Sequence, residues 1–168
     1  MSHIVLVGMM GVGKSTVGRA LAATLDRPLF DSDEMIEERT GRTVRDIWLT
    51  DGEPAFRSLE TDVLLEALAA DDPSVIAAAG GVVLSETNRS ILQAADADVV
   101  WLLADIEVLV DRTRSGGHRP LLDEDPEANL RRMYTERAPL YQEVADAIVS
   151  VDNRSVNDVA RAVLRCCA

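Results

Sequence analysis

The chain has 168 residues, of which 47% are hydrophobic and 27% charged, and its formal net charge is −12. This length is typical of one domain with a substantial core, so we expect a single domain over residues 1–168. The acidic balance argues against nucleic acid as a partner, because phosphate contacts need clustered lysine and arginine. There is neither a basic leader nor an apolar run of the ~18 residues that a membrane span needs, so we expect no membrane association.

The two cysteines, Cys166 and Cys167, are neighbours near the C-terminus. Adjacent cysteines rarely form a disulfide, and this spacing does not fit a metal site. We therefore expect a reducing, cytoplasmic environment. We also expect a monomer whose partners are small molecules.

Short β-rich runs alternate with segments of helical periodicity along the whole chain. Several of these runs are continuously apolar, which is typical of strands covered by helices on both faces. The runs are HIVLVG (3–8), PLFDSD (28–33), SVIAAA (74–79), DVVWLL (98–103) and AIVSV (147–151). The alternation predicts an α/β domain with a doubly wound parallel sheet and helices on both faces.

GMMGVGKST, residues 8–16, contains the only lysine of a chain that otherwise uses arginine for its positive charges. The pattern G-x-x-x-x-G-K-[ST] is fulfilled by Gly8, Gly13, Lys14 and Ser15. A strand-like run precedes it and a helical run follows, which is the context of a phosphate-binding loop. A compact ammonium can reach β- and γ-phosphates inside such a loop, whereas a guanidinium is bulkier and has a fixed fork geometry. We therefore predict a phosphate site in which Lys14 is catalytic.

FDSD, at the end of the second predicted strand, places Asp31 and Asp33 two residues apart. With the period of a strand, both carboxylates would lie on one face at the sheet edge where open α/β folds bind ligands. One could then lie near Mg²⁺ and the other near an acceptor hydroxyl. Alternatively, Ser32 or Asp33 could cap a helix expected at 34–39.

The pattern of residues 53–69 predicts an amphipathic helix with Arg57 at the border of its apolar stripe. Arg57 could form surface ion pairs with Glu53 and Glu60, which lie four before it and three after it. However, it immediately follows Phe56 at the border of the buried stripe, which an ordinary surface arginine would not.

Arg137 continues the apolar stripe of a helix predicted to open at Asp125 and Pro126. An arginine on an apolar face requires an anionic partner, which could be an internal carboxylate or an anion in a pocket. The segment SGGHRPLLDEDP (115–126), just before this helix, could be a plain surface loop or a mobile lid hinged at its two glycines.

Together these motifs resemble the series found in shikimate kinases. The matching segments are GMMGVGKST (8–16), FDSD (30–33), the FR of EPAFRSLE (56–57), AGG (79–81), RPLL (119–122) and ERAPLY (136–141). They come in family order and at family spacing over nearly the whole chain. The resemblance implies a three-layer P-loop kinase fold with a five-stranded parallel sheet, helices on both faces, a lid at about 115–126 and a substrate-binding region at about 32–60.

The reaction implied by the resemblance is the ATP-dependent phosphorylation of the 3-hydroxyl of shikimate, a step of aromatic amino acid biosynthesis. The implied catalytic residues are Lys14, Asp33 and Arg119. Asp33 would orient or deprotonate the hydroxyl, and Arg119 would stabilise the transferring phosphoryl group. The implied shikimate-binding residues are Asp33, Arg57, Gly80, Gly81 and Arg137, with Glu60 steadying Arg57.

The resemblance also implies a nucleotide site and a metal site. The residues implied for ATP are Gly11, Val12, Gly13, Lys14, Ser15, Thr16, Arg112, Arg119 and Arg154, with Arg112 and Arg154 flanking the adenine. Ser15 would ligate Mg²⁺, with Asp31 close by.

The chain departs from the family pattern at two places. Ala79 stands where the family usually has glycine, and Ser155-Val156 lacks a proline often found after Arg154. Two other functions fit parts of the pattern. A related kinase for gluconate or a nucleotide could use the two arginines to hold a phosphate. A nucleotide-dependent regulatory module would need no acceptor-orienting carboxylate, so Asp33 argues against it.

Overall fold

The computed structural model describes residues 1–115 and 125–167. Five parallel strands form one sheet in the order β2-β3-β1-β4-β5. The strands are β1 (His3–Val7), β2 (Leu29–Asp31), β3 (Val75–Ala77), β4 (Ala97–Leu103) and β5 (Ala147–Ser150). The five predicted strands and their parallel arrangement are thus confirmed.

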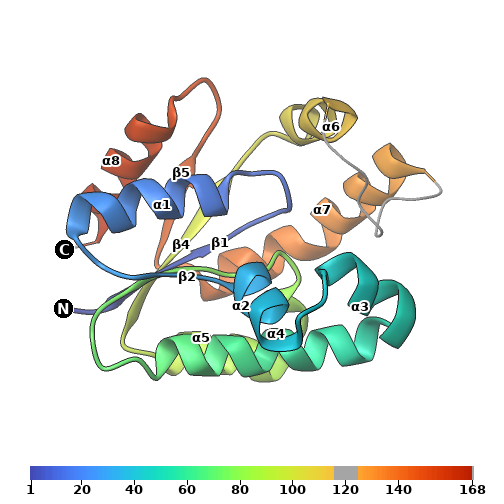
Figure 1. The fold of residues 1–168 in the computed structure, drawn as a ribbon. Coiled ribbons are helices and arrows are strands. Elements are labelled where there is room, and N and C mark those ends of the chain that lie inside the picture. Colours follow the sequence, from blue (N-terminus) through green and yellow to red (C-terminus); the bar gives the residue numbers. More distant parts are fainter. Residues whose placement is uncertain (116–124, 168) are drawn as a thin grey trace.

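Helices cover both faces of this sheet. They are α1 (Lys14–Leu25), α2 (Ser32–Thr40), α3 (Val44–Asp51), α4 (Glu53–Leu68), α5 (Glu86–Ala94), α6 (Ile106–Ser115), α7 (Pro126–Val144), α8 (Val156–Cys166) and the short 3-10 helix η1 (Val82–Leu84). Figure 1 shows α1 and α8 side by side on one face, with α4, α5 and α7 on the other. Within the ranges that the structure describes, no helix is long and apolar enough to cross a membrane.

β1 is the central strand, and each of its residues is buried. The main core surrounds it, because helices lie on both faces and strands lie on both edges. A second, smaller core consists of Ile36, Ile47, Phe56 and Val63, contributed by α2, α3 and α4. These three helices therefore pack together as a unit beside the sheet, over most of the region that the sequence assigns to the substrate.

The strand geometry predicted for FDSD is wrong. β2 ends at Asp31, and α2 begins at the next residue, so Asp33 lies in the first turn of a helix. The reason is a helix cap: the Asp31 carboxylate accepts hydrogen bonds from the backbone N–H groups of Asp33 and Glu34 at 3.1 and 3.2 Å. The cap is Asp31 itself, rather than Ser32 or Asp33.

The segment 115–126, predicted as a loop or a lid, falls mostly on residues outside the described ranges. Ser115 ends α6, and Asp125 caps α7 by accepting from the N–H of Ala128. Arg119, the third predicted catalytic residue, also lies outside the described residues.

Candidate active site

The loop between β1 and α1 turns tightly at the carboxyl end of the sheet. Gly11 and Gly13 have φ values of 81° and 104°, which residues with a side chain rarely adopt. At Gly8 a Cβ atom would lie 2.7 Å from the carbonyl oxygen of Leu102 in β4. Glycine is thus required at Gly8 by a close backbone approach and at the other two positions by backbone conformation.

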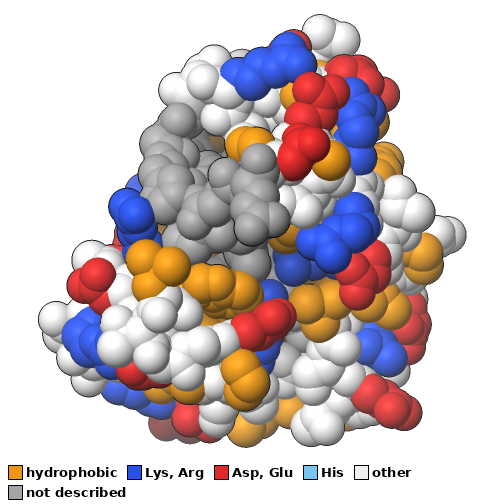
Figure 2. All heavy atoms as spheres, turned by 90° about the vertical axis from the view of Figure 1, so that its right-hand side faces the viewer, with side chains coloured by type: hydrophobic (Ala, Val, Ile, Leu, Met, Phe, Trp, Pro, Cys, Tyr) orange, Lys and Arg blue, Asp and Glu red, His pale blue; other side chains and the backbone are white. Residues whose placement is uncertain are grey.

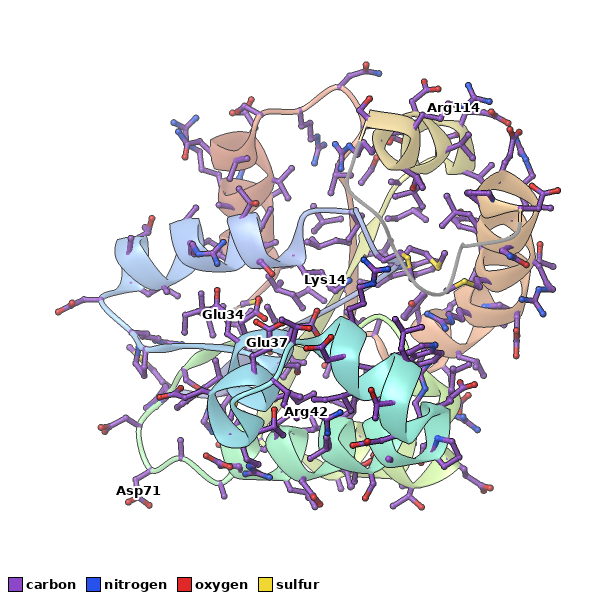
Figure 3. All side chains as sticks on the ribbon, turned by 45° about the vertical axis from the view of Figure 1, so that its right-hand side comes forward. Lys14, Glu34, Glu37, Arg42, Asp71 and Arg114 are labelled. Atoms are coloured by element: carbon purple, nitrogen blue, oxygen red, sulfur yellow. The ribbon has the colours of Figure 1, made fainter. Side chains whose placement is uncertain are left out.

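Lys14 is the first residue of α1, and its side chain folds back along this loop. Its Nζ donates hydrogen bonds to the carbonyl oxygens of Gly8 and Met9, at 2.7 and 3.0 Å. Figure 3 shows Lys14 between the start of α1 and the helices α2 and α3. The ammonium therefore lies inside the loop, next to the N-terminal end of a helix dipole that favours anions.

A cavity of about 360 Å³ opens beside Lys14. Its wall is formed by the loop, the first residues of α1, the two aspartates of FDSD and the segment that follows β3. The lining residues are Met10, Gly11, Gly13, Lys14, Ser15, Thr16, Asp31, Asp33, Ala77, Ala78, Ala79 and Gly80. The structure thus brings Asp31 and Asp33 to one cavity although they belong to different elements.

Ser15 and Asp31 are in direct contact at the floor of this cavity, because the Ser15 hydroxyl donates to Oδ2 of Asp31. The other carboxylate oxygen of Asp31 caps α2. A hydroxyl and a carboxylate are oxygen ligands of the kind that Mg²⁺ accepts, together with water and phosphate. Among the described residues, no cluster of three or more His, Cys, Asp or Glu could hold a metal by itself.

Arg57 and Glu60 form a partly buried pair on α4. Glu60 is only 1% exposed and accepts a hydrogen bond from Nη1 of Arg57. Burial raises the pKa of the Glu60 carboxyl, and the neighbouring Arg57 guanidinium opposes this shift. Arg57 also reaches Glu53 at 3.3 Å and lies over the ring of Trp48, with 5.4 Å from Cζ to the ring centroid. The predicted ion pairs exist, and one of them is buried rather than on the surface.

Arg137, on α7, is 4% exposed. Within the described part of the chain it forms no ion pair. Its Nη1 lies 3.6 Å from the position that a Cβ on Gly80 would occupy, and Nη1 of Arg57 occupies the place of a Cβ on Gly81. The two guanidinium groups, from different helices, therefore both lie against the Gly80–Gly81 turn.

Polar atoms at this turn lack hydrogen-bond partners. Nη2 of Arg57, Nε of Arg137 and Oε2 of Glu60 are buried without a partner in the described structure. The two arginine nitrogens are donors and Oε2 of Glu60 is an acceptor, and buried donors are costly unless a ligand satisfies them. An anionic group between the two arginines would do so.

A second cavity, of about 290 Å³, lies on the other side of the phosphate loop. Its walls include Val151, Val159, Arg112 from α6 and Arg154 from the turn after β5. Nη1 of Arg112 donates to the carbonyl oxygens of Gly11 and Val12, at 2.9 and 3.1 Å, and Arg154 donates to that of Ser150 at 3.3 Å. An apolar pocket flanked by two arginines suits a flat base joined to phosphates.

The family model for shikimate kinase matches residues 10–168. The chain belongs to the shikimate kinase family. A shikimate kinase of Symbiobacterium thermophilum is 44% identical over 96% of this chain and 94% of its own length. The solved structure of the Acinetobacter baumannii shikimate kinase in complex with shikimate superposes with a TM-score of 0.92 at 40% identity, covering 98% of this chain and 92% of that one. A gluconokinase of Sinorhizobium meliloti, at 20% identity and a TM-score of 0.61, shares the fold alone.

Membership of the shikimate kinase family confirms the resemblance seen in the motifs, and with it a kinase of the P-loop fold. The departure at Ala79 is sterically mild. Asp26 and Asn153 are the non-glycine residues with positive φ among those described, so the Ala79 backbone does not need glycine. Ala79 is among the residues that line the cavity beside the phosphate loop.

The sequence reasoning missed the side chains that hold the turn after β3. Asn88 donates from Nδ2 to the carbonyl oxygen of Val82 at 3.0 Å, and Arg89 donates to that of Val83 at 2.9 Å. The Tyr141 hydroxyl donates to the carbonyl oxygen of Gly80 at 2.5 Å. Of these side chains, only Tyr141 had a signal in the sequence, because it continues the apolar stripe of the predicted helix beyond Arg137. Nothing in the local pattern marks Asn88.

Proposed function

We propose that this chain transfers the γ-phosphoryl group of ATP to the 3-hydroxyl of shikimate, giving ADP and shikimate 3-phosphate. Its place in the shikimate kinase family supports this activity. The observation that carries the proposal is the convergence of Arg57 and Arg137 on the Gly80–Gly81 turn, with unpaired buried donor atoms on both. Two guanidinium groups with free donors suit a single carboxylate, which shikimate has.

On the side of ATP, the phosphoryl donor, the loop glycines and Lys14 would bind the β- and γ-phosphates. Backbone N–H groups would be offered to these phosphates by Gly11, Val12, Gly13, Ser15 and Thr16. The purine would occupy the cavity flanked by Arg112 and Arg154. Lys14 would exchange its two carbonyl partners for phosphate oxygens, because an ammonium binds an anion more strongly than a neutral carbonyl.

The metal of this reaction would be Mg²⁺, held by the Ser15 hydroxyl with the Asp31 carboxylate beside it. Their contact supports this, because it leaves two oxygen ligands at the floor of the phosphate cavity. Bound there, the ion would neutralise charge on the phosphates of ATP.

On the acceptor side, Asp33 would hold the ring hydroxyls of shikimate and orient or deprotonate the 3-hydroxyl. Its place on the wall of the cavity that also contains Lys14 supports this role. Arg119 would stabilise the transferring group. The small core of α2, α3 and α4 supports a substrate-binding region at about 32–60 within one domain.

Cytoplasmic location and a monomeric state complete the proposal. Small molecules rather than nucleic acids would be its partners. On the face of the molecule drawn in Figure 2, basic side chains alternate with acidic and uncharged ones, whereas a nucleic-acid surface has a continuous basic stripe.

The direct test of the activity is ADP release from Mg-ATP with and without shikimate. We expect ADP only when both substrates are present, and none when gluconate or a nucleoside monophosphate replaces shikimate. Turnover with gluconate or the nucleotide but not with shikimate would overturn the proposal. ATP binding without turnover on any acceptor would indicate a regulatory module instead.

The test of the substrate site is the pair Arg57→Ala and Arg137→Ala. Truncating one partner of a desolvated charge pair costs roughly 2–5 kcal/mol, so kcat/KM for shikimate should fall roughly 30- to several-thousandfold. The KM for ATP should stay the same. Arg132→Ala is the matched control, because Arg132 lies exposed on α7, the helix of Arg137, and contacts Asn129.

Shikimate methyl ester gives a complementary test of the same clamp. The ester lacks the charge that the two arginines would bind, so it should be a poor substrate of the unmutated enzyme. In Arg57→Ala the penalty for the ester should shrink, because both changes remove one interaction. Equal phosphorylation of acid and ester by the unmutated enzyme would rule the clamp out.

A further inference from the structure

Tyr141 is the largest fully buried side chain of the chain's described part, and its hydroxyl points to the acceptor side of the site. It lies one helical turn after Arg137 on α7, and its ring packs against Trp101 of β4 with centroids 5.8 Å apart. A buried tyrosine whose ring is fixed must find hydrogen-bond partners for its hydroxyl among neighbouring groups. The hydroxyl therefore has to find partners near Gly80 and Arg137.

The hydroxyl lies against the same glycine as Arg137. It donates to the Gly80 carbonyl oxygen at 2.5 Å, and Nη1 of Arg137 lies 3.6 Å from the position that a Cβ on Gly80 would occupy. Tyr141 and Arg137, one helical turn apart on α7, thus meet at the turn that follows β3. Burial raises the pKa of Tyr141 to about 12, so the hydroxyl keeps its proton near neutral pH and remains a donor.

We propose that Tyr141 is a positioning residue, which fixes the Arg137 guanidinium against the Gly80–Gly81 turn so that its buried Nε–H stays free for the anionic group of the acceptor. This rests on the proposed function for the identity of the acceptor. The reason is geometric: a guanidinium has five donors, and one that is not held can rotate to satisfy them with backbone carbonyls. Holding one edge of Arg137 leaves the remaining donors directed at the ligand.

The turn is held from its other side as well, which leaves Arg137 as the movable part. Asn88 binds the carbonyl oxygen of Val82, and its own Oδ1 accepts from Thr61 of α4 at 2.9 Å. Because α4 and α5 already fix the backbone after Gly81, loss of the Tyr141 hydroxyl should release the arginine more than the turn. An effect on acceptor binding is therefore expected, rather than a general loss of the site.

The kinetic test compares Tyr141→Phe with Tyr134→Phe. Both tyrosines of the chain lie on α7, and among the described residues no hydrogen bond joins Tyr134 to the turn or to Arg137. Removing the hydroxyl that lies beside the Arg137 guanidinium should raise the KM for shikimate roughly 5- to 50-fold. The KM for ATP and the KM for shikimate methyl ester should change less than about twofold. Tyr134→Phe should change neither the KM for shikimate nor the KM for ATP.

A double mutant shows whether Tyr141 acts through Arg137. In the Arg137→Ala background, Tyr141→Phe should have no further effect on the KM for shikimate, because the group it positions is gone. Equal changes in the KM for shikimate and for ATP would mean that Tyr141 only supports the fold, and so would a full effect in the double mutant. Either result overturns the proposal.

A readout without substrate separates this proposal from the proposed function. Solvent exchange of the Arg137 Nε–H, followed by NMR and assigned through Arg137→Lys, should be slow in the unmutated protein and in Tyr134→Phe. In Tyr141→Phe it should be at least about tenfold faster. Unchanged exchange overturns the positioning role even if shikimate is phosphorylated. Absence of shikimate turnover in the unmutated enzyme overturns the proposed function, while the exchange still decides the role of Tyr141.

Discussion

Lys14 illustrates how much a single side chain depends on the backbone around it. Its ammonium donates to two carbonyl oxygens of the loop that precedes it. One of them belongs to Gly8, which lies too close to β4 to carry a side chain. A guanidinium is larger and planar, and it cannot present a point charge to a moving phosphoryl group. The single lysine of the chain therefore stands where its shape matters.

We expect Lys14→Arg to lower kcat for phosphoryl transfer roughly 100-fold or more, nearly as much as Lys14→Met, because charge alone does not replace the ammonium in the loop. Steady-state ADP release measures this. Arg161→Lys, the reverse exchange at an exposed residue of α8, should leave kcat unchanged. Normal turnover in Lys14→Arg would show that the loop accepts a guanidinium.

The two glycines of the Gly80–Gly81 turn differ in what an added side chain would meet. A Cβ at Gly81 would coincide with Nη1 of Arg57, whereas one at Gly80 would meet its nearest neighbour at 3.4 Å. Gly81→Ala should therefore displace Arg57 and raise the KM for shikimate at least about tenfold, with little change in the KM for ATP. Ala79→Gly should leave both constants within about threefold, since Ala79 has no positive φ. A normal KM for shikimate in Gly81→Ala would remove Arg57 from the acceptor site.

At the scale of elements, the junction of β2 and α2 joins stability to chemistry. Asp31 ends the strand, caps the helix with one carboxylate oxygen and accepts from Ser15 with the other. The cap turns the chain into α2 immediately, which puts Asp33 on the first turn of the helix and on the wall of the phosphate cavity. One carboxylate therefore determines both where the helix starts and what faces the phosphates.

Asp31→Asn should separate these two roles. An amide oxygen still accepts from the N–H groups of Asp33 and Glu34, so the free energy of unfolding should change by less than about 1 kcal/mol. The lost charge should raise the Mg²⁺ concentration needed for half-maximal activity at least about fivefold. Urea unfolding and Mg²⁺ titrations of the activity measure the two effects.

Thr43→Ala is the matched control for the cap. The Thr43 hydroxyl caps α3 by accepting from the N–H of Asp46 at 3.1 Å. Its loss should cost about 1 kcal/mol of stability and leave the Mg²⁺ requirement unchanged. If Asp31→Asn shows an ordinary Mg²⁺ requirement, Asp31 serves only as a helix cap.

For the whole molecule, the order of the strands decides where the two cavities lie. β1 is central, so the phosphate loop that follows it lies in the middle of the carboxyl edge. The cavity with Asp31, Asp33 and Gly80 opens toward β3 and β2, and the cavity with Arg112 and Arg154 opens toward β4 and β5. The two cavities share Gly11, Gly13 and Thr16 of the loop and the start of α1, so the proposed acceptor and nucleotide sites would adjoin there, as transfer between two substrates requires.

The same packing buries Glu60, and this gives the whole molecule a pH-dependent stability. Since burial raises its pKa in the folded state, the folded protein holds the proton at pH values where the unfolded chain has lost it. The contribution of Glu60 is full below its ordinary pKa and is lost as the pH rises through the raised value. The free energy of unfolding of the unmutated protein, minus that of Glu60→Gln, should therefore fall as the pH rises above the ordinary glutamate pKa of about 4.

Asp51→Asn should show a pH dependence of stability with the opposite sign. The hydrogen bond from Arg42 lowers the pKa of the exposed Asp51, so its contribution is lost as the pH falls. Urea unfolding at several pH values, with each variant subtracted from the unmutated protein, measures both slopes. A difference for Glu60→Gln that rises with pH would mean that Arg57 outweighs burial and holds Glu60 ionised.

The sequence by itself determined the parts of this protein that depend on neighbouring residues. The phosphate loop, its lysine and the five strands follow from glycine spacing and apolar runs, and the motif series indicated the family. Arg57 and Arg137 could be selected as arginines at apolar faces, but their common target could not. Only the tertiary structure brought them from α4 and α7 to one turn, moved Asp33 from strand to helix and joined Tyr141 to Gly80. These contacts join residues far apart in the chain, and they depend on strand order and helix packing, which local periodicity does not encode.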